Sequence, residues 1–584
     1  MIGNQSPNKG KNKKMSKNHK GSFTFVLNSH LSYVLGHGSL PHGNDWLNEV
    51  VAKTYIPLLN VLNKLIEEGI SPKITIGITP VLAEQLTSED FSQEFIRYLQ
   101  NKTDEVIANQ QEFKELGMSH LYKLAQFWQE YYVQILVDFI EKYRQDIIGE
   151  FRRLQDQEHI EIITSCATHS YLPLLSLDTS ITAQVKQGIS SYKRFFGVHP
   201  RGFWLPECAY RPGYEWTPPV QMQNAYLRKG IDEFLSEEGI DYFIIDSHLL
   251  MGGKTIGVYA GRFEILKKLC QQIENEYQPK EEYKSPYDVY LVNSDKKPVA
   301  IFIRDPKTSL QVLSEQCGYH RNRWYLDFHK KHFPGGHRYW RVTSAETDLV
   351  NKLEYEPDKI EESIKENASH FKEIIKPILL NYYNQHKKPG IVVSPFDTEI
   401  FGYWWFEGPM WLYHVLKGID ADPELKLTTC SQYLQDSPPS TVVSIPEGSW
   451  GEGGYHWIWL NEWTIWTWKY IYETEKIMQK LATEFADAQD EIIQDILKQL
   501  ARELLLLQAS DWQFLISTWS TRDYGEQRII EHYETFKRLE NLLIKYTKNE
   551  PIEPGEWNLF NSTKKRDVLF PDIDYKWWVK KECV

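Results

Sequence analysis

The sequence predicts an α/β fold: a seven-stranded (β/α) barrel with a helical insert, followed by an α-helical C-terminal domain. Three observations lead to this prediction. Short apolar runs alternate with helical stretches over roughly the first 400 residues, which is typical of a parallel sheet. Nearly every run is followed at once by polar or ionisable residues, which a barrel gathers at one mouth. From about residue 411 onward, only long helical periodicity is clear.

The predicted strands are rich in Val, Ile and Phe, and several are apolar throughout, as strands buried on both faces are. They are residues 23–27, 74–79, 160–165, 202–205, 242–245, 299–303 and 391–393. The side chains that follow them are His30, His169, Glu207, Asp246 with His248, Arg304 with Asp305, and Asp397. A doubly wound open sheet would spread these groups along an edge and gather them only at a switch point, so we favour the barrel.

The remaining segments complete the expected organisation. Residues 1–21 are polar and rich in Lys and Asn, so we expect a disordered basic tail. The barrel should occupy residues 22–410, with a helical insert at about 92–158 that is too long for a simple crossover. Residues 411–584 should form the helical domain, and 438–461, rich in Pro, Gly and Trp, should be a loop.

Composition narrows the possible functions. The formal net charge of -13 argues against nucleic acid as a main partner, because polyphosphate binding needs a positive surface. The chain contains 20 Trp and 34 Tyr, whose flat faces and polar edges suit sugar rings, although they could equally be core filling. Six scattered cysteines, no apolar run of membrane length and no signal-peptide pattern favour a cytoplasmic protein. No metal-ligand spacing is present, and we expect no cofactor.

Two carboxylates follow predicted strands in the same way. Glu207 and Asp397 each come after an apolar run and a proline that we expect to end the strand, and aromatic residues follow both. Cleavage of a glycosidic bond needs two carboxyl groups, a nucleophile or base and a proton donor, in different environments. Each acid could instead only cap the following helix. The repeated arrangement favours Glu207 and Asp397 as the working pair.

The motifs around these residues resemble glycoside hydrolase family 57, specifically its α-1,4-glucan branching enzymes. The resemblance covers nearly the whole chain from residue 22 and depends on many ordered matches. They are LNSHLSYV at 27–34, CATHSYLPL at 166–174, WLPECAY at 204–210, RDP at 304–306 with Gln311, FDTEIFG at 396–402, SWGEGG at 449–454 and WLN at 459–461. The resemblance implies a retaining mechanism on a seven-stranded barrel with a helical C-terminal domain, which agrees with the strand count above.

The resemblance also assigns roles to residues. Glu207 would be the nucleophile and Asp397 the general acid/base. The substrate-binding positions would be His30, Trp46, His169, Arg304, Trp450, Trp459 and Asp511. Structural alternatives remain open for them: satisfied core histidines and tryptophans, an Arg304 that only pairs with a neighbouring acid, and an Asp511 that only caps a helix. A loop at 252–286, which contains Tyr259, is a candidate for closing over the site.

The sequence departs from the family pattern at Asn28, Leu313, Tyr403, Tyr455 and Ser520, where the family usually has His, Trp, His, Asp and Gln. Asn28 can still hydrogen-bond a hydroxyl but carries no charge. The carboxylate pair is intact, so the expected activity is branching of an α-glucan. Two alternatives stay open: a 4-α-glucanotransferase or amylase of the same family, and a catalytically impaired glucan-binding protein.

Overall fold

The protein is described by a computed structural model that covers residues 19–38, 42–220, 224–251, 284–292, 294, 296–314, 316–344 and 346–580. The expected tail therefore lies mostly outside the described residues, although Lys20 forms an ion pair with Glu424 and Gly21 begins the first strand. The proposed closing loop at 252–286, with Tyr259, also lies outside them up to residue 283.

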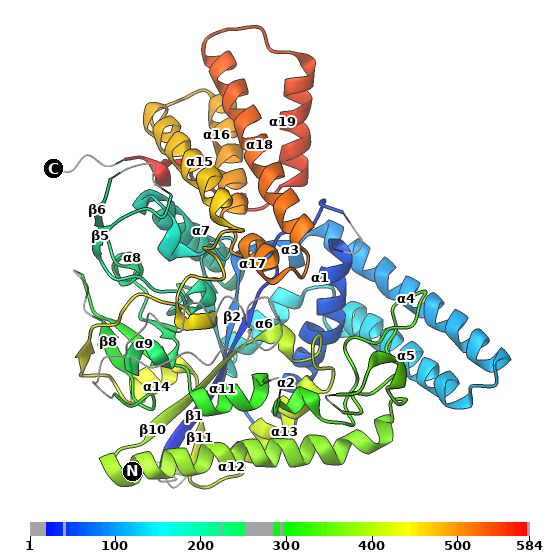
Figure 1. Cartoon of the computed structure of the whole chain (residues 1–584). Helices are drawn as coiled ribbons and strands as arrows, with labels where there is room; N and C mark the ends of the chain where they lie inside the picture. Colours follow the sequence, from blue (N-terminus) through cyan, green and yellow to red (C-terminus); the bar gives the residue numbers. More distant parts are fainter. Residues whose placement is uncertain are drawn as a thin grey trace, which may run out of the picture.

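A curled, mostly parallel sheet forms the centre of the molecule (Figure 1). All seven predicted strands are present and lie side by side in the order β10-β1-β2-β3-β4-β7-β9. Their bounds are β1 Gly21–Ser29, β2 Ile74–Ile78, β3 Ile160–Ser165, β4 Gly202–Trp204, β7 Tyr242–Ile245, β9 Val299–Ile303 and β10 Gly390–Asp397. Their side chains are almost all buried, which explains why the runs lack alternation.

The first and last of these seven strands, β10 and β9, meet at a single point. Arg304, the residue after β9, forms an isolated parallel bridge with Val393 of β10, and the Asp305 N–H donates to the Val393 carbonyl at 2.9 Å. This contact closes the barrel. The predicted strand end before Pro395 was wrong, because β10 continues to Asp397. Proline has no N–H, and at Pro395 that N–H would point away from β1, toward the side of β10 that meets β9. The contact with β9 ends at Val393, so the proline removes no hydrogen bond of the sheet.

Short strands extend the sheet beyond the seven. β8 Tyr290–Val292 pairs antiparallel with β9, β12 Val442–Val443 pairs with β8, and β11 Leu425–Leu427 pairs with β1. A separate hairpin consists of β5 Tyr214–Trp216 and β6 Tyr226–Arg228. Two of these strands follow residue 411, so the sheet continues to Val443 and the purely helical part begins only after it.

Helices surround the sheet. Those of the first part are α1 Asn44–Val50, α2 Ile56–Glu67, α3 Pro80–Leu86, α7 Asp178–Phe196, α8 Ile231–Glu237, α9 Ser247–Met251, α11 Pro306–Leu313, α12 Ile360–His386, α13 Gly408–Asp420 and α14 Cys430–Asp436. The helical insert between β2 and β3 contains α4 Glu89–Glu115, α5 Ser119–Val137 and α6 Ile147–Asp156. Helices α4 and α5 form a hairpin that reaches away from the barrel (Figure 1).

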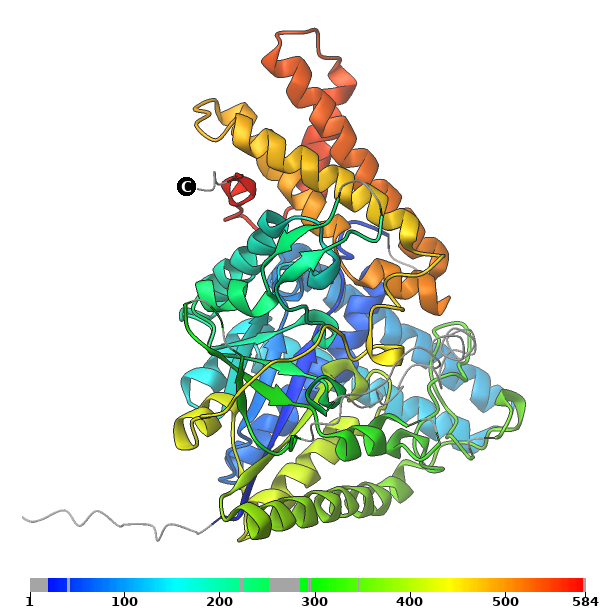
Figure 2. The ribbon, with the colours of Figure 1, turned by 60° about the vertical axis from the view of Figure 1, so that its left-hand side comes forward.

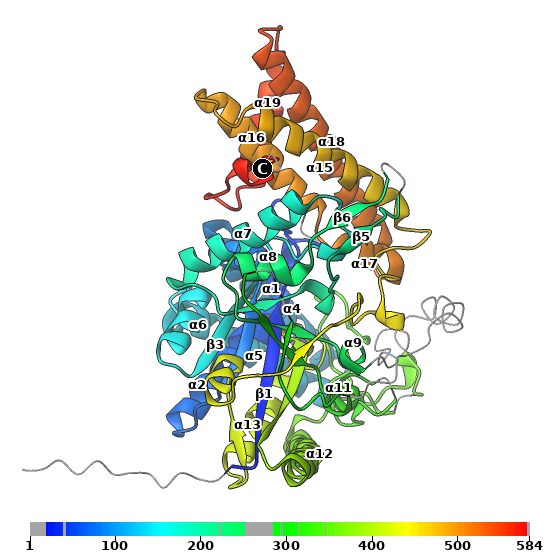
Figure 3. The same ribbon diagram turned by 90° about the vertical axis from the view of Figure 1, so that its left-hand side faces the viewer.

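The C-terminal helices form a bundle above the carboxyl ends of the strands. They are α15 Ile465–Glu484, α16 Glu491–Leu507, α17 Asp511–Thr518, α18 Arg522–Thr547 and α19 Pro554–Arg566. Most of the bundle stands clear of the barrel (Figure 2), and the short helix α17 lies at the junction between them (Figure 3). Since the strands deliver their last residues toward this junction, the bundle can contribute side chains to a site at the barrel mouth.

Candidate active site

Glu207 lies in the turn Pro206–Cys208, directly after β4, and its side chain is almost completely buried. Its φ of 60° is in the left-handed region, which costs a non-glycine residue about 1–3 kcal/mol and recurs at functional sites. Two hydrogen bonds hold the carboxyl group. The indole Nε1 of Trp450 donates to Oε2 at 2.7 Å, and the Ser510 hydroxyl donates to Oε1 at 3.3 Å. Both oxygens are therefore fixed by donors from distant segments.

Asp397 ends β10, where it lies beside Asn28 of β1 in the register of the sheet. Burial, and then the charge of Asp397, raise the pKa of Glu207 to about 8. The same two causes raise the pKa of the buried Glu399 to about 8. Because a charge shifts a pKa strongly only at short range, the structure brings Glu207 and Asp397 into one site. The two acids that the sequence proposes as a working pair therefore lie within electrostatic reach of each other.

Two stacked imidazoles lie next to the carboxylates. The rings of His30 and His169 are 4.0 Å apart and nearly parallel. His30 Nδ1 is 3.0 Å from the Thr79 hydroxyl. Burial, and then the proximity of His30, hold the pKa of His169 well below its usual range, so His169 is neutral. Among the described residues, the buried Nε2 of His169 has no hydrogen-bond partner. Such an unsatisfied group at the carboxylate site is suited to a ligand hydroxyl.

One short turn of the helical bundle contacts both histidines. Ser510 Oγ lies 3.1 Å from His169 Nδ1, and the Ser510 N–H donates to the His169 carbonyl at 3.1 Å. Asp511 lies 3.0 Å from His30 Nε2 through one of its carboxylate oxygens. While the Ser510 hydroxyl donates to ionised Glu207, it accepts from His169 Nδ1–H, which leaves His169 Nε2 as an acceptor. Sequence reasoning found Asp511 but missed Ser510.

A buried ion pair between Arg304 and Asp246 lies beside the Trp450 ring. Arg304 donates to Asp246 at 3.1 Å and to the Ser309 hydroxyl at 2.9 Å, and its guanidinium lies 5.4 Å from the centre of the Trp450 ring. Burial alone would raise the pKa of Asp246, but the hydrogen bond to His248 and the charge of Arg304 hold it below its usual range. Arg304 therefore pairs with a neighbouring acid, the structural alternative that the sequence left open, and positions the indole that binds Glu207.

The other two predicted tryptophans lie outside this network of described contacts. Trp46 is on α1, partly buried against the apolar core. Trp459 is fully buried and stacks on Tyr171, with ring centres 4.5 Å apart. With no exposed surface, the Trp459 indole presents no open face to a sugar in this structure. Its core alternative fits its burial, and local sequence does not reveal which face of a loop tryptophan is covered.

Glu399 is a further site residue that sequence reasoning missed. Its Oε1 accepts from the His30 backbone N–H at 3.1 Å and from the Tyr55 hydroxyl. Its position two residues after Asp397, in the motif at 396–402, was the available signal. Through these contacts, Glu399 ties the turn after β10 to the turn after β1, so Asp397 and His30 are held in a common frame.

Five positions depart from the family pattern, and one of them, Asn28, lies beside Asp397 in the register of the sheet. The Oδ1 atom of Asn28 is buried and has no hydrogen-bond partner among the described residues. Leu313 is buried on α11, and the Tyr403 N–H donates to the Thr54 hydroxyl at 3.0 Å. Tyr455 is about one-third exposed, and the Ser520 hydroxyl lies 2.9 Å from that of Thr518. The two hydrogen-bond donors that hold Glu207, Trp450 and Ser510, are not among these five positions.

Within the part of the chain that the structure describes, two groups of side chains have ligand atoms close enough for a metal ion, within 4.8 Å of one another in each group. They are His30, His169 and Asp511 at the barrel mouth, and Glu503, His532 and Asp567 in the bundle. In the second group, Arg528 contacts His532 and Arg566 contacts Asp567, so cations of the protein already occupy the surroundings. In the first, His30 Nε2 already contacts Asp511, and His169 contacts Ser510 through Nδ1 while its Nε2 has no partner among the described residues.

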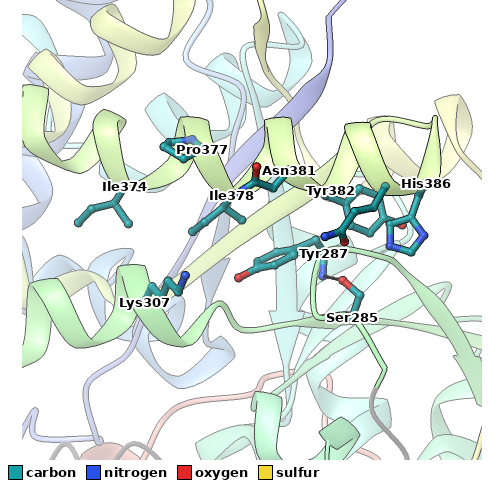
Figure 4. A pocket seen from close by; sticks show the side chains of 10 residues that line it. Ser285, Tyr287, Lys307, Ile374, Pro377, Ile378, Asn381, Tyr382 and His386 are labelled. Atoms are coloured by element: carbon teal, nitrogen blue, oxygen red, sulfur yellow. Dashed lines mark hydrogen bonds between the residues drawn. The ribbon is translucent and has the colours of Figure 1, made fainter.

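A separate cavity of about 380 Å³ lies between α11 and α12 (Figure 4). Ile374, Pro377, Ile378 and Tyr382 of α12 face Lys307 and Tyr287 across it. The Tyr287 carbonyl accepts from the N–H of Ile391, at the beginning of β10. Asp397 is six residues further along that strand, about 20 Å away. The cavity is therefore not part of the carboxylate site.

The helices that the structure describes include none with the length and apolar character of a membrane span.

Comparison with known proteins agrees with this geometry. Residues 24–446 match the family described as glycosyl hydrolase family 57, and residues 470–578 match the C-terminal region described as that of 1,4-alpha-glucan branching enzymes. A 1,4-alpha-glucan branching enzyme of Thermococcus kodakarensis is 39% identical over 555 residues, which cover 95% of this chain and 78% of that protein.

Solved structures give the same result. The structure of the Thermococcus branching enzyme matches with a TM-score of 0.88 and covers 96% of this chain and 97% of that one. A branching enzyme from Pyrococcus horikoshii matches at 39% identity with a TM-score of 0.86 and the same coverage. The α-amylase AmyC from Thermotoga maritima matches at 25% identity, with a TM-score of 0.78, over 96% of this chain and all of that one. With its strand-end carboxylates and helical C-terminal bundle, this chain belongs to glycosyl hydrolase family 57.

Proposed function

We propose that this protein is a retaining 1,4-α-glucan branching enzyme. It cleaves an α-1,4 bond and transfers the released chain to a 6-hydroxyl of another glucan, in the synthesis of a glycogen-type polymer. The observation that carries the proposal is the pair Glu207 and Asp397, two coupled carboxyl groups at one barrel mouth, of which Glu207 has a raised pKa and two fixed donors. The branching enzymes among the relatives support the type of transfer.

In the first step, the Glu207 carboxylate attacks the anomeric carbon and Asp397 gives its proton to the departing glycosidic oxygen. In the second, an acceptor 6-hydroxyl attacks that carbon, Asp397 takes its proton and Glu207 leaves. In the free site the raised pKa of Glu207 keeps the shared proton on Glu207. The proton must move to Asp397 in the complex, and the donors Trp450 and Ser510 favour this because they stabilise the ionised Glu207.

The neighbouring polar groups would hold the sugar at the cleavage point. His169 Nε2 is a free acceptor among the described residues, and Asp511 with His30 presents a second polar edge. Transfer rather than hydrolysis requires that water be excluded while the acceptor chain is held in place. Trp450 and the helical bundle exclude water and hold the acceptor chain, and Trp459 packs behind them. Arg304 is assigned the positioning of Trp450.

The substrate class and the place of action are also part of the proposal. The net charge of -13 suits a neutral glucan better than a polyanion, and no nucleic acid partner is proposed. Cys166, Cys208 and Cys430 are buried free thiols, which supports action in the reducing cytoplasm. Hydrolysis or α-1,4 transfer is the alternative, because the related Thermotoga protein is described as an α-amylase.

The test is incubation of the full chain with amylose, followed by proton NMR of the linkages. Branching predicts new α-1,6 signals with little increase in reducing ends. Release of reducing ends without α-1,6 signals would assign the protein to the hydrolases, and redistribution of α-1,4 chain lengths alone would assign it to the glucanotransferases. Glu207→Gln is the matched control, since it keeps the shape of the site and removes the nucleophile. Turnover by that variant would refute the assigned role of Glu207.

A further inference from the structure

Two tryptophans meet on the surface of the helical part, away from the two carboxyl groups. The rings of Trp463 and Trp519 are 6.1 Å apart between centres and nearly perpendicular. Trp519 is 51% exposed, although Arg522 lies 4.8 Å from the centre of its ring. Ile465, next to Trp463 in the chain, is 40% exposed. Together these side chains form an exposed apolar patch.

Both tryptophans are held at a fixed distance from the site. Helix α17 begins at Asp511, which contacts His30, and is capped at its other end by Trp519. Its eight residues correspond to a rise of about 12 Å. The loop that carries Trp463 is bound to the same helix, because the Asn461 side chain donates to Ser517 at 2.8 Å and accepts from the Trp463 N–H at 2.9 Å.

Folding alone does not account for Trp519. Its φ of 55° is in the left-handed region at the end of a helix, where glycine is preferred and any other residue is strained. An exposed indole also leaves a large apolar surface in water. A residue that is unfavourable for both the backbone and the solvent is expected where its ring contacts a ligand.

We propose that Trp463 and Trp519 form a remote subsite for α-glucan, which binds a distant part of a chain that also occupies the carboxylate site. The proposal rests on the function proposed above. Aromatic faces bind the apolar C–H faces of sugar rings, while the Arg522 guanidinium and the Ser520 hydroxyl lie nearby for sugar hydroxyls. Arg522 is paired with Glu526 at 2.7 Å, which compensates the positive charge beside Trp519 and suits a neutral ligand.

The patch is connected to the carboxylate site, which indicates that its ligand is the glucan bound there. One route leads from His30 through Asp511 and α17 to Trp519. The other leads from Trp450, which binds Glu207, along the loop to Trp463. A polymer that extends a few sugar rings beyond the cleavage point would reach the patch, whereas a short oligosaccharide would not. The subsite should therefore distinguish long chains from short ones.

The experiment compares Trp519→Ala, Trp463→Ala and Trp519→Gly in the full chain, with the exposed aromatic variant Phe333→Ala as control. Binding to amylose is measured by affinity electrophoresis, and kcat/KM is measured with amylose and with maltoheptaose. Each tryptophan variant should bind amylose about three- to tenfold more weakly than wild type. The ratio of kcat/KM for amylose to that for maltoheptaose should fall by a similar factor, and Phe333→Ala should leave both quantities unchanged.

Trp519→Gly separates a lost subsite from a damaged fold, because glycine relieves the left-handed backbone while it removes the ring. Its melting temperature should equal or exceed that of wild type while amylose binding weakens. Wild-type affinity in Trp519→Gly, with amylose turnover intact in the parent, would overturn the remote subsite and leave the proposed function standing. Failure of the parent itself to bind or convert amylose would instead overturn the proposed function.

Discussion

The Ser510 hydroxyl donates a hydrogen bond to Glu207 across 303 residues of sequence, and the same hydroxyl lies 3.1 Å from His169 Nδ1. The hydroxyl has one proton to donate, so the direction of its hydrogen bond with Glu207 determines the direction of its hydrogen bond with His169. While Glu207 is ionised, Ser510 donates to it and His169 donates to Ser510. When Glu207 is protonated on Oε1, both bonds can reverse, and His169 then carries its proton on Nε2. Ser510 therefore couples the state of the carboxyl group to the tautomer of the imidazole.

Ser510→Ala should lower kcat/KM at neutral pH about tenfold or more, the effect of losing one hydrogen bond to a charged group. The Ser510 donor stabilises ionised Glu207, so its loss raises the pKa of that carboxyl group further. Because the nucleophile must be ionised, the rising limb of the pH profile should move to higher pH. The measurement is kcat/KM against pH with amylose.

Ser236→Ala is the control for this variant. The Ser236 hydroxyl is also buried and hydrogen-bonded, to the Lys297 carbonyl, but it lies away from the carboxylates. It should lose stability without a change in the pH profile. An unmoved profile in Ser510→Ala, with lower activity at every pH, would mean that Ser510 supports the fold rather than Glu207.

Asp397→Asn should lower turnover of amylose by about 10²–10⁴-fold, because the leaving oxygen is no longer protonated. The charge of Asp397 is also a cause of the raised pKa of Glu207. Removing it should shift ionisation of Glu207 to lower pH. An α-glucosyl fluoride needs no proton for its leaving group, so it reports this shift directly. Fluoride release by Asp397→Asn should begin at a lower pH than in wild type; an unchanged onset would contradict the coupling.

Glu207→Gln should be more stable than wild type at neutral pH. The folded pKa of about 8 lies above the ordinary value of 4.5, so between these values the unfolded chain has released a proton that the folded protein keeps. Wild-type stability therefore falls as pH rises from about 4.5 to 8, and glutamine has no such loss. The difference at pH 7 should be on the order of 3 kcal/mol. Urea unfolding at pH 4 and pH 7 tests it, since the difference should be small at pH 4.

Arg304→Met should destabilise the protein by about 3–5 kcal/mol, because it leaves the buried Asp246 carboxylate without its cation. Adding Asp246→Asn to this variant should recover part of the lost stability. Turnover should stay low in the double variant, since the guanidinium that supports Trp450 is still missing. Urea unfolding and amylose turnover of the single and double variants give the two readouts. Full recovery of turnover would show that Arg304 matters for stability alone.

The strands and the carboxylates were predictable because both are local signals. Each buried strand has a run of apolar side chains, and the residue after it must lie at the barrel mouth whatever the rest of the chain does. Glu207 and Asp397 follow from that rule, and the register of β10 against β1 places Asp397 beside Asn28. The family resemblance supplied the roles, which the run lengths alone do not contain.

Ser510 and the burial of Trp459 were not predictable from local pattern. Ser510 reaches the site only because α16 and α17 turn back onto the barrel, a tertiary arrangement without a motif. Trp459 is covered by Tyr171, which lies nearly three hundred residues earlier, a contact that no loop composition reveals. The extension of β10 past Pro395 is similarly a tertiary effect. It depends on β9 ending its contact with β10 before the proline, on the side where proline has no N–H to donate.

The turn that contains Ser510 and Asp511 also has a consequence for the order in which the working enzyme appears during synthesis. A ribosome completes the barrel strands and Glu207 long before it reaches the residues that hold Glu207 and His30 in place. The emerging chain can close its sheet early, yet its nucleophile stays unsupported until the last quarter of the protein has been made and has docked. Chains that end before Ser510 are therefore expected to show no turnover of amylose.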